Sequence, residues 1–234
     1  VELLRMMGDK TTARALALMS LAGLAQAQDL SRISNTDASA GLKSALERGA
    51  TAAVNLLGKP DGFLANPKVH IPLPGFLKDA AKFMKALGQG KQLEELEVTI
   101  NRAAEAAVPL ARQLLIDAVK GISVADAKKI LTGGETSVTT FFADKTRAPL
   151  SERFLPVVTQ AVAKVGLAEK YNQVAKKVSG TGLVKSEDAS IEHYVTRKTL
   201  DGLYLMIGEE EKKIRQDPVG TGSALLQKVF GAMK

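Results

Sequence analysis

The chain has 234 residues, of which 45% are hydrophobic, 24% charged and 4% aromatic, and its formal net charge is +7. This composition is that of one globular domain with a substantial core. The sequence has no cysteine, which excludes disulfides, thiolate nucleophiles and Cys-ligated metal sites. Abundant alanine and few aromatic residues favour helix over sheet, so we expect an all-α fold.

The N-terminal segment has the three-part layout of a secretory signal peptide. Lys10 and Arg14 precede an apolar run over residues 15–25, and Ala25-Gln26-Ala27 is a small-x-small cleavage site. The apolar run is too short to span a bilayer. We therefore expect cleavage after Ala27, export to the periplasm, and no transmembrane segment in the mature protein.

These features predict three parts in the chain. Residues 1–27 are the signal peptide, and Met6 or Met7 is a more usual start than Val1. Residues 28–36 are polar and form a flexible leader, and residues 37–234 form one helical domain. The basic residues are spread out and not interleaved with aromatic ones, which argues against a nucleic-acid partner.

The helical domain is expected to open with a helix that ends at residue 57. Thr36 or Asp37 can cap its start, and Gly58 followed by Pro60 is a typical stop. The expected buried stripe consists of Leu42, Ala45, Leu46, Gly49, Ala53, Leu56 and Leu57.

Residues 58–75 are expected to form a proline-rich strap rather than a helix. Pro67, Pro72 and Pro74 each lack a backbone donor and favour extended geometry in the preceding residue. The apolar side chains that should hold the strap on the bundle are Phe63, Leu64, Val69, Ile71 and Leu73. A long segment of this kind in a compact domain is often functional or a packed loop.

A short helix is expected over residues 76–87 and a long one from Leu93 to Ala118. Pro109 lies within the long helix, where it lacks an N–H and clashes with the preceding turn. We therefore expect two helical pieces that meet near Val108.

Glycine and proline divide the next residues into shorter predicted helices. One helix starts after Ser123 and ends at Gly133-Gly134, and another starts near Thr136. Arg147-Ala148-Pro149 should break that helix, so that a new one covers residues 151–165. The remaining short helices are expected at 167–178 and, near the end, at 223–230.

The segment from Ser190 to Gln216 is predicted to be the central helix of a bundle. Between Leu200 and Ile207 only Asp201 and Gly202 are not large and apolar, so the apolar side chains surround nearly the whole helix. Its ends should be solvated. Two i,i+4 ion pairs are expected near the end, Glu209–Lys213 and Glu211–Arg215.

Several strings in the chain are uncommon, and together they resemble one family. In order they are ASAGLKSAL, LGKPDGFLANPKVHIPLP, INRAAEAAVPLA, LTGGETSVTTFFADKTR and YVTRKTLDGLYLMIGEEEKKIRQDP. The chain resembles the DUF4197 family of exported bacterial proteins over about residues 39–230. The resemblance implies an all-helical periplasmic protein of Gram-negative type. Because the function of the family is unknown, it assigns no catalytic or ligand residues.

The first candidate site lies on the central helix, where Tyr194, Lys198 and Asp201 share one face. Lys198 and Asp201 are close enough to pair, and burial beside the apolar segment would perturb their pKa values. The alternative is a buried structural pair that fixes the helix register, and this is the interpretation we adopt.

Two further candidates lie elsewhere. Gly133-Gly134 precedes a helix start at Thr136 and is followed by Lys145 and Arg147, which is a layout for anion binding, although adjacent helix caps give the same pattern. The other is Asn101-Arg102 with Glu105, where Arg102 and Glu105 are either part of a ligand site or a solvated surface pair.

Metal and cofactor chemistry has no support in the sequence. His70 and His193 are the two histidines, and neither has other ligands at a recognisable spacing. We interpret them as structural or surface side chains and expect no metal and no cofactor.

These observations favour a non-enzymatic, soluble periplasmic protein that binds an envelope protein or an amphiphilic or anionic ligand. The alternative is a cofactor-independent enzyme that uses acid–base side chains such as Lys198, Asp201 and Glu105. The oligomeric state stays open.

Overall fold

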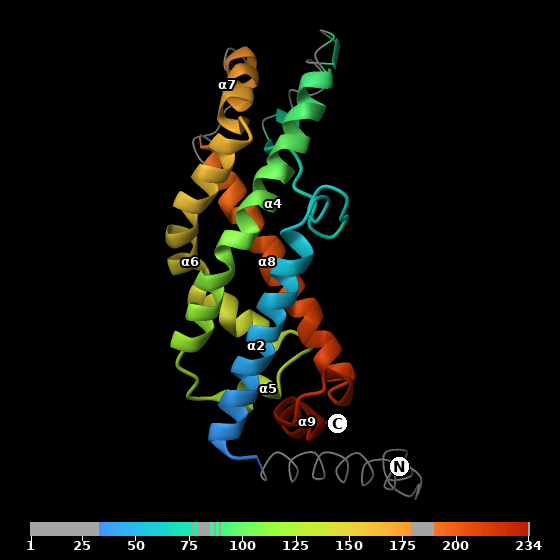
Figure 1. Ribbon diagram of the computed structural model, residues 1–234, viewed down its shortest axis with the longest axis vertical. Coiled ribbons are helices and arrows are strands. Elements are labelled where there is room, and N and C mark those ends of the chain that lie inside the picture. The colour runs from blue at the N-terminus through green and yellow to red at the C-terminus, as the bar shows by residue number, and fades with distance from the viewer. Residues whose placement is uncertain are drawn as a thin grey trace, which may run out of the picture.

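The computed structural model describes residues 33–75, 77–78, 85–86, 88, 90–178 and 190–233. Within them the chain is an elongated all-helical bundle without a strand, which confirms the predicted fold class (Figure 1). Its helices are α2 (Asn35–Leu57), α4 (Gly90–Gly121), α5 (Ala127–Leu131), α6 (Ser137–Lys164), α7 (Leu167–Val178), α8 (Ile191–Gln216), the 3₁₀ turn η4 (Val219–Thr221) and α9 (Ala224–Gly231). The predicted signal peptide and most of the predicted helix at 76–87 lie outside the described residues.

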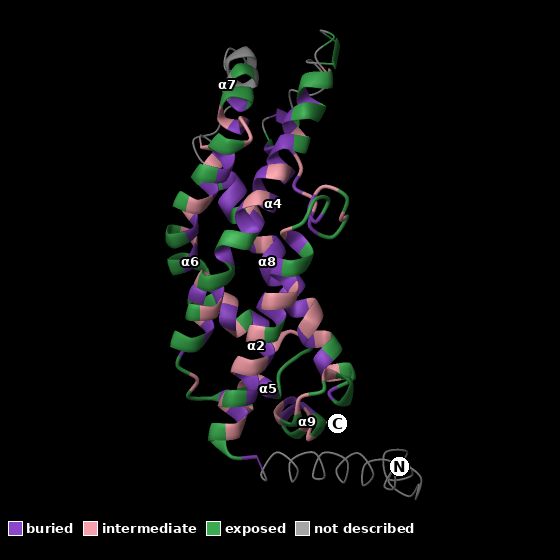
Figure 2. Ribbon diagram, viewed as in Figure 1, coloured by how far each residue is buried: buried purple, intermediate pink, exposed green. Residues whose placement is uncertain are grey.

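Helix α8 is central, as the sequence predicts. It packs mainly against α2 and α6, and Leu203, Met206 and Ile207 are buried (Figure 2). The enclosure is not complete, because Leu205 is 43% exposed. The end of this helix is solvated only in part, since Lys213 is exposed but Glu211 is only 2% exposed.

Helix α2 begins slightly earlier than expected and has a different cap. Ser34, rather than Thr36 or Asp37, is the N-cap: its Oγ accepts a hydrogen bond from the Asp37 N–H at 2.9 Å. The same Oγ donates to Asp37 Oδ2 at 2.8 Å. Lys228 of α9 pairs with Asp37 at 2.8 Å, so the last helix is attached to the start of the first described one.

The helix breaks expected at Pro109 and Pro149 are wrong. Helix α4 continues through Pro109, and α6 continues through Pro149 and Pro156 as one helix. All three prolines lie at exposed positions of their helices. Their neighbours Val108 and Leu150 are buried, and this packing holds the helices continuous.

The strap has neither helix nor strand between residues 58 and 74, and its Phe63 and Ile71 are buried. A Cβ at Gly202 of α8 would lie 2.7 Å from Phe63 Cε1. The Phe63 ring thus fills the space that a side chain at position 202 would occupy. The strap therefore packs against α8 at Gly202, the small residue within the apolar run.

The shorter elements follow the sequence pattern closely. Helix α7 has the bounds expected for it, and Ser223 caps α9 by accepting a hydrogen bond from the Leu226 N–H at 3.3 Å. None of the helices in the described part of the chain is long and apolar enough to cross a membrane.

Candidate functional site

The side of α8 that carries Asp201 separates two hollows. A groove of about 540 Å³ lies between α6 and α8, and Arg147, Arg197 and Asp201 line it. A hollow of about 140 Å³ lies between α8 and the strap, and Lys198 and Asp201 line it. We call Arg147, Arg197, Lys198 and Asp201 the α8 flank.

Asp201 pairs with α6 and not with Lys198. Arg147 Nη1 donates to Asp201 Oδ1 at 2.6 Å, and both side chains are more than 40% exposed. The Arg147 guanidinium also lies 4.9 Å from the centroid of the Tyr204 ring. The buried Lys198–Asp201 pair that we expected is therefore wrong, because the fork of an arginine on the neighbouring helix takes the carboxylate.

Tyr204 lies beneath this ion pair and is buried. Burial raises the pKa of Tyr204, and the hydrogen bond to Thr146 and the charge of Arg147 offset this only in part. The phenol is therefore a neutral hydrogen-bonding group, and Tyr204 supports Arg147 from below.

Tyr194 and Lys198 have different roles, although the sequence groups them. Tyr194 is buried and its Oη donates to the Pro72 carbonyl at 2.7 Å, so it fastens the strap to α8. Lys198 is half-buried, and the described residues give its ammonium no hydrogen bond or ion pair. Arg197 extends along the other side, with its guanidinium 5.5 Å from the Tyr194 ring centroid.

The Glu105 carboxylate is buried and links α4 to the strap by hydrogen bonds. It is not one half of a solvated surface pair. Its Oε1 accepts hydrogen bonds from the N–H groups of Phe63 and Leu64, both at 3.0 Å. Its Oε2 accepts from Arg102 Nη1 at 2.7 Å, while Arg102 Nη2 donates to Asp61 at 2.8 Å. Both carboxylate oxygens serve the fold, and Glu105 is 5% exposed.

Asn101 makes a second link between α4 and the strap, next to that of Glu105. Its side chain accepts from the Ile71 N–H at 2.9 Å and donates to the Ile71 carbonyl at 2.8 Å, as a neighbouring strand would. It is fully buried. The sequence analysis names it beside Arg102 but does not predict this partner, because a lone asparagine on a helix has no local pattern that reveals one.

The predicted anion site at the start of α6 already holds an anion from the protein itself. Glu211 of α8 accepts from the Val138 N–H at 3.1 Å, and from the Thr139 N–H and Oγ1 at 2.8 and 2.7 Å. Thr136 makes no side-chain cap bond. The N-terminus of α6 thus binds a carboxylate, but this carboxylate belongs to the protein itself.

Arg215 completes this buried group. It pairs with Glu211 at 2.8 Å, which confirms one of the two expected ion pairs. The other, between Glu209 and Lys213, is wrong: Lys213 pairs with Glu210, and Glu209 pairs with Lys212 and Lys68. The candidate Lys145 lies apart from the rest, in a groove of about 570 Å³ between α5 and α6.

His70 lies in the strap, close to the start of α4. Its Nε2 is 2.7 Å from Glu97 Oε1, and its Nδ1 is 2.9 Å from the Leu64 carbonyl oxygen. Partial burial, the largest contribution, lowers the pKa of His70, but the two hydrogen bonds and the Glu97 charge together outweigh it and raise the pKa above its ordinary value. No group of three or more metal-ligating side chains occurs among the described residues.

Comparisons with known proteins bear on the family and not on the ligand. A family model with the description "Protein of unknown function (DUF4197)" matches residues 32–231. Searches among curated proteins and among solved structures gave no match. The chemistry of the site therefore has to be argued from its own geometry.

Proposed function

Since this chain belongs to the DUF4197 family, whose function is unknown, we propose from its geometry that it is a non-enzymatic binding module of the periplasm. Its ligand carries a phosphate or carboxylate group and binds to the α8 flank.

The observation that carries this proposal is the ammonium of Lys198, which has no hydrogen bond or ion pair among the described residues and lies beside a carboxylate held by an arginine. In the groove and hollow of the flank, Arg147, Arg197 and Lys198 face Asp144 and Asp201. Lys68 is also there, but it pairs with Glu209. Arginine forks match carboxylate and phosphate oxygens, and an exposed ion pair such as Arg147–Asp201 is weak enough for a ligand to exchange.

A binding role is supported over an acid–base enzyme by how the carboxylates are used. Glu105 and Glu211, the buried ones, accept backbone N–H groups and arginine donors with both oxygens. Asp201 forms its ion pair with Arg147 and not with a lysine. General acid–base chemistry needs a carboxyl group that can exchange a proton with a substrate, and both buried glutamates are engaged in the fold.

The periplasmic location is part of the proposal and is supported by the N-terminal pattern alone. N-terminal sequencing of the protein purified from cell extracts should give Gln28 as the first residue. A retained segment before Ala27 on periplasmic material would contradict it.

The binding proposal is tested with two probes that share one chemistry. Inorganic phosphate represents a free anion, and vesicles of phosphatidylcholine with phosphatidylglycerol, compared with phosphatidylcholine alone, represent a lipid headgroup. We expect Lys198→Ala to weaken binding of the effective probe about tenfold, the loss of one charge-assisted contact. Lys213→Ala is the matched control, because Lys213 lies on the same helix and is exposed.

A second variant gives the opposite sign. Asp201→Asn removes the carboxylate that competes for Arg147 and should tighten binding severalfold, while unfolding changes by less than about 1 kcal/mol because the pair is exposed. Binding of phosphate alone identifies a free ligand, and binding of anionic vesicles alone a lipid headgroup. Failure of both probes, or equal effects of Lys198→Ala and Lys213→Ala, would overturn the proposal.

A further inference from the structure

A second pocket lies between the strap and the first turns of α4 and shares no residue with the α8 flank. It has a volume of about 400 Å³, within the range of about 300–1,000 Å³ that is typical of small-molecule sites. Its apolar wall consists of Leu64, Leu73, Leu93 and Val98. Val98 is 41% exposed, so its side chain can be reached from solvent.

The charged groups at this pocket are unequal in their availability. Lys78 and Lys85 line it, and the described residues give neither ammonium a hydrogen bond or ion pair. Two carboxylates also line it. Glu97 Oε1 lies 2.7 Å from His70 Nε2, whereas Glu94 has no partner among the described residues. The charged groups of the pocket that have no partner among the described residues are therefore Lys78, Lys85 and Glu94, next to an apolar wall.

We propose that this pocket binds a single-chain amphiphile with an anionic head, such as a fatty acid. The leucines and Val98 would cover the hydrocarbon chain, because burial of each methylene is favourable by about 0.8 kcal/mol. Lys78 and Lys85 would bind the head as charge-assisted donors. An uncharged amphiphile would gain only the first contribution, and a small anion only the second.

The strap gives this pocket a rigid wall. Asn101 and Glu105 hold Ile71, Phe63 and Leu64 by backbone hydrogen bonds, so the strap side of the pocket is already formed before a ligand binds. A preformed wall lowers the ordering cost of binding. The inference is independent of the proposed function, since a ligand here touches none of the flank residues.

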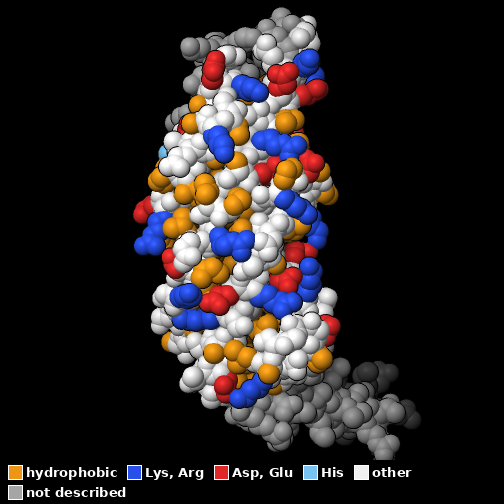
Figure 3. Space-filling view, viewed as in Figure 1, with side chains coloured by type: hydrophobic (Ala, Val, Ile, Leu, Met, Phe, Trp, Pro, Cys, Tyr) orange, Lys and Arg blue, Asp and Glu red, His pale blue; other side chains and the backbone are white. Residues whose placement is uncertain are grey.

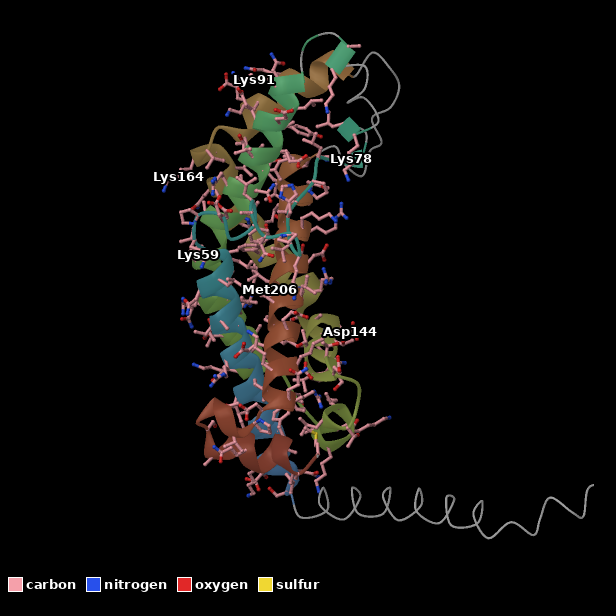
Figure 4. The ribbon with its side chains drawn as sticks, turned by 90° about the vertical axis from the view of Figure 1, so that its right-hand side faces the viewer. Lys59, Lys78, Lys91, Asp144, Lys164 and Met206 are labelled. Atoms are coloured by element: carbon pink, nitrogen blue, oxygen red, sulfur yellow. The ribbon has the colours of Figure 1, made fainter. Side chains whose placement is uncertain are left out.

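The test uses titration calorimetry of the purified protein with dodecanoate below its micelle concentration, and with dodecanol as the uncharged probe. We expect Lys78→Ala combined with Lys85→Ala to weaken dodecanoate binding about tenfold or more and to leave dodecanol binding unchanged. Lys91→Ala is the matched control. Lys91 is exposed at the start of α4, outside the pocket lining, and Figure 4 shows it apart from Lys78.

A second variant tests the apolar wall. Val98→Glu places a charge on a partly exposed position and should abolish binding of both probes without unfolding the protein, which circular dichroism verifies. The proposal is overturned if the wild-type protein does not bind dodecanoate, if Val98→Glu binds it unchanged, or if the lysine double variant behaves like Lys91→Ala. These results leave the flank unaffected, so the two proposals can fail separately.

Discussion

Glu105 in α4 and Glu211 in α8 bind the backbone in the same way in two different regions of the bundle. Each is a buried glutamate that accepts hydrogen bonds from two consecutive backbone N–H groups, and each pairs with an arginine about one turn away on its own helix. One fastens an irregular strap, and the other closes the first turn of a helix.

The two regions differ in how completely the arginine is enclosed. Arg215 is 15% exposed, and it also donates to the Leu131 carbonyl at 2.9 Å and to Ser137 Oγ at 2.8 Å. Arg102 is 37% exposed and shares its charge with Asp61, which is 58% exposed. The Glu211 group is thus sealed within the fold, whereas the Glu105 group reaches solvent.

The lysines that the two proposals use lie at the strap end of the bundle. At the Glu211 end the helix N-terminus and the buried arginine already have partners. At the strap end Lys78, Lys85 and Lys198 have none within the described residues. Elsewhere the charges are mixed, as Lys and Arg alternate with Asp and Glu over the face formed by α2 and α4 (Figure 3). Both proposed sites therefore adjoin the strap.

The largest expected effect is at the sealed group. Glu211→Ala leaves two backbone N–H groups without an acceptor and a nearly buried guanidinium without its counter-charge, which should lower the free energy of unfolding by about 3–5 kcal/mol. Urea denaturation measures it. Glu210→Ala is the control: its ion pairs involve exposed partners, and it should cost less than about 1 kcal/mol. Equal costs for the two variants would contradict the comparison.

Glu105→Ala should be less costly than Glu211→Ala. The N–H groups of Phe63 and Leu64 lose their acceptor, but Arg102 can turn to water and keep Asp61, so we expect about 2–3 kcal/mol. The strap should also open locally, and limited trypsin digestion should cut after Lys68 before it cuts the helices. A loss larger than that of Glu211→Ala would reverse the ranking of the two groups.

The smallest expected effect is the pH dependence of stability that the His70–Glu97 pair at the strap contributes. Because the pKa of His70 is raised in the folded state, its pairing with Glu97 contributes stability in full below the unfolded value of about 6.5 and loses it as the pH rises through the folded pKa. The contribution should be less than about 1 kcal/mol, since both side chains are about one-third exposed. Denaturation of the wild type and of His70→Gln across this range should show a fall in stability only in the wild type. Identical pH profiles would show that the pair contributes nothing.

The sequence predicts those parts of the fold that depend on local pattern. The bounds of α7 and the burial of Leu203 follow from helical periodicity and from glycine and proline signals. The breaks at Pro109 and Pro149 were wrong because the cost of a proline depends on whether its side of the helix faces water, and that is set by packing.

The site was predictable only in part, for a related reason. Glu105 lies 41 and 42 residues from the N–H groups that it binds, and Glu211 lies 72 and 73 residues from its own. No local spacing marks such partners, so the sequence gives the residue types without their roles. It also grouped Lys198 with Asp201 by helical rotation, although an arginine of α6 lies closer to that carboxylate.

The capping of α6 by Glu211 has a consequence for the order in which the protein can assemble. The first turn of α6 has no side-chain cap of its own, and its acceptor is supplied by a residue far along the chain. A polypeptide that emerges N-terminus first must therefore present this turn uncapped until α8 has followed it. The start of α6 should be among the last backbone in the bundle to gain protection from hydrogen exchange during refolding.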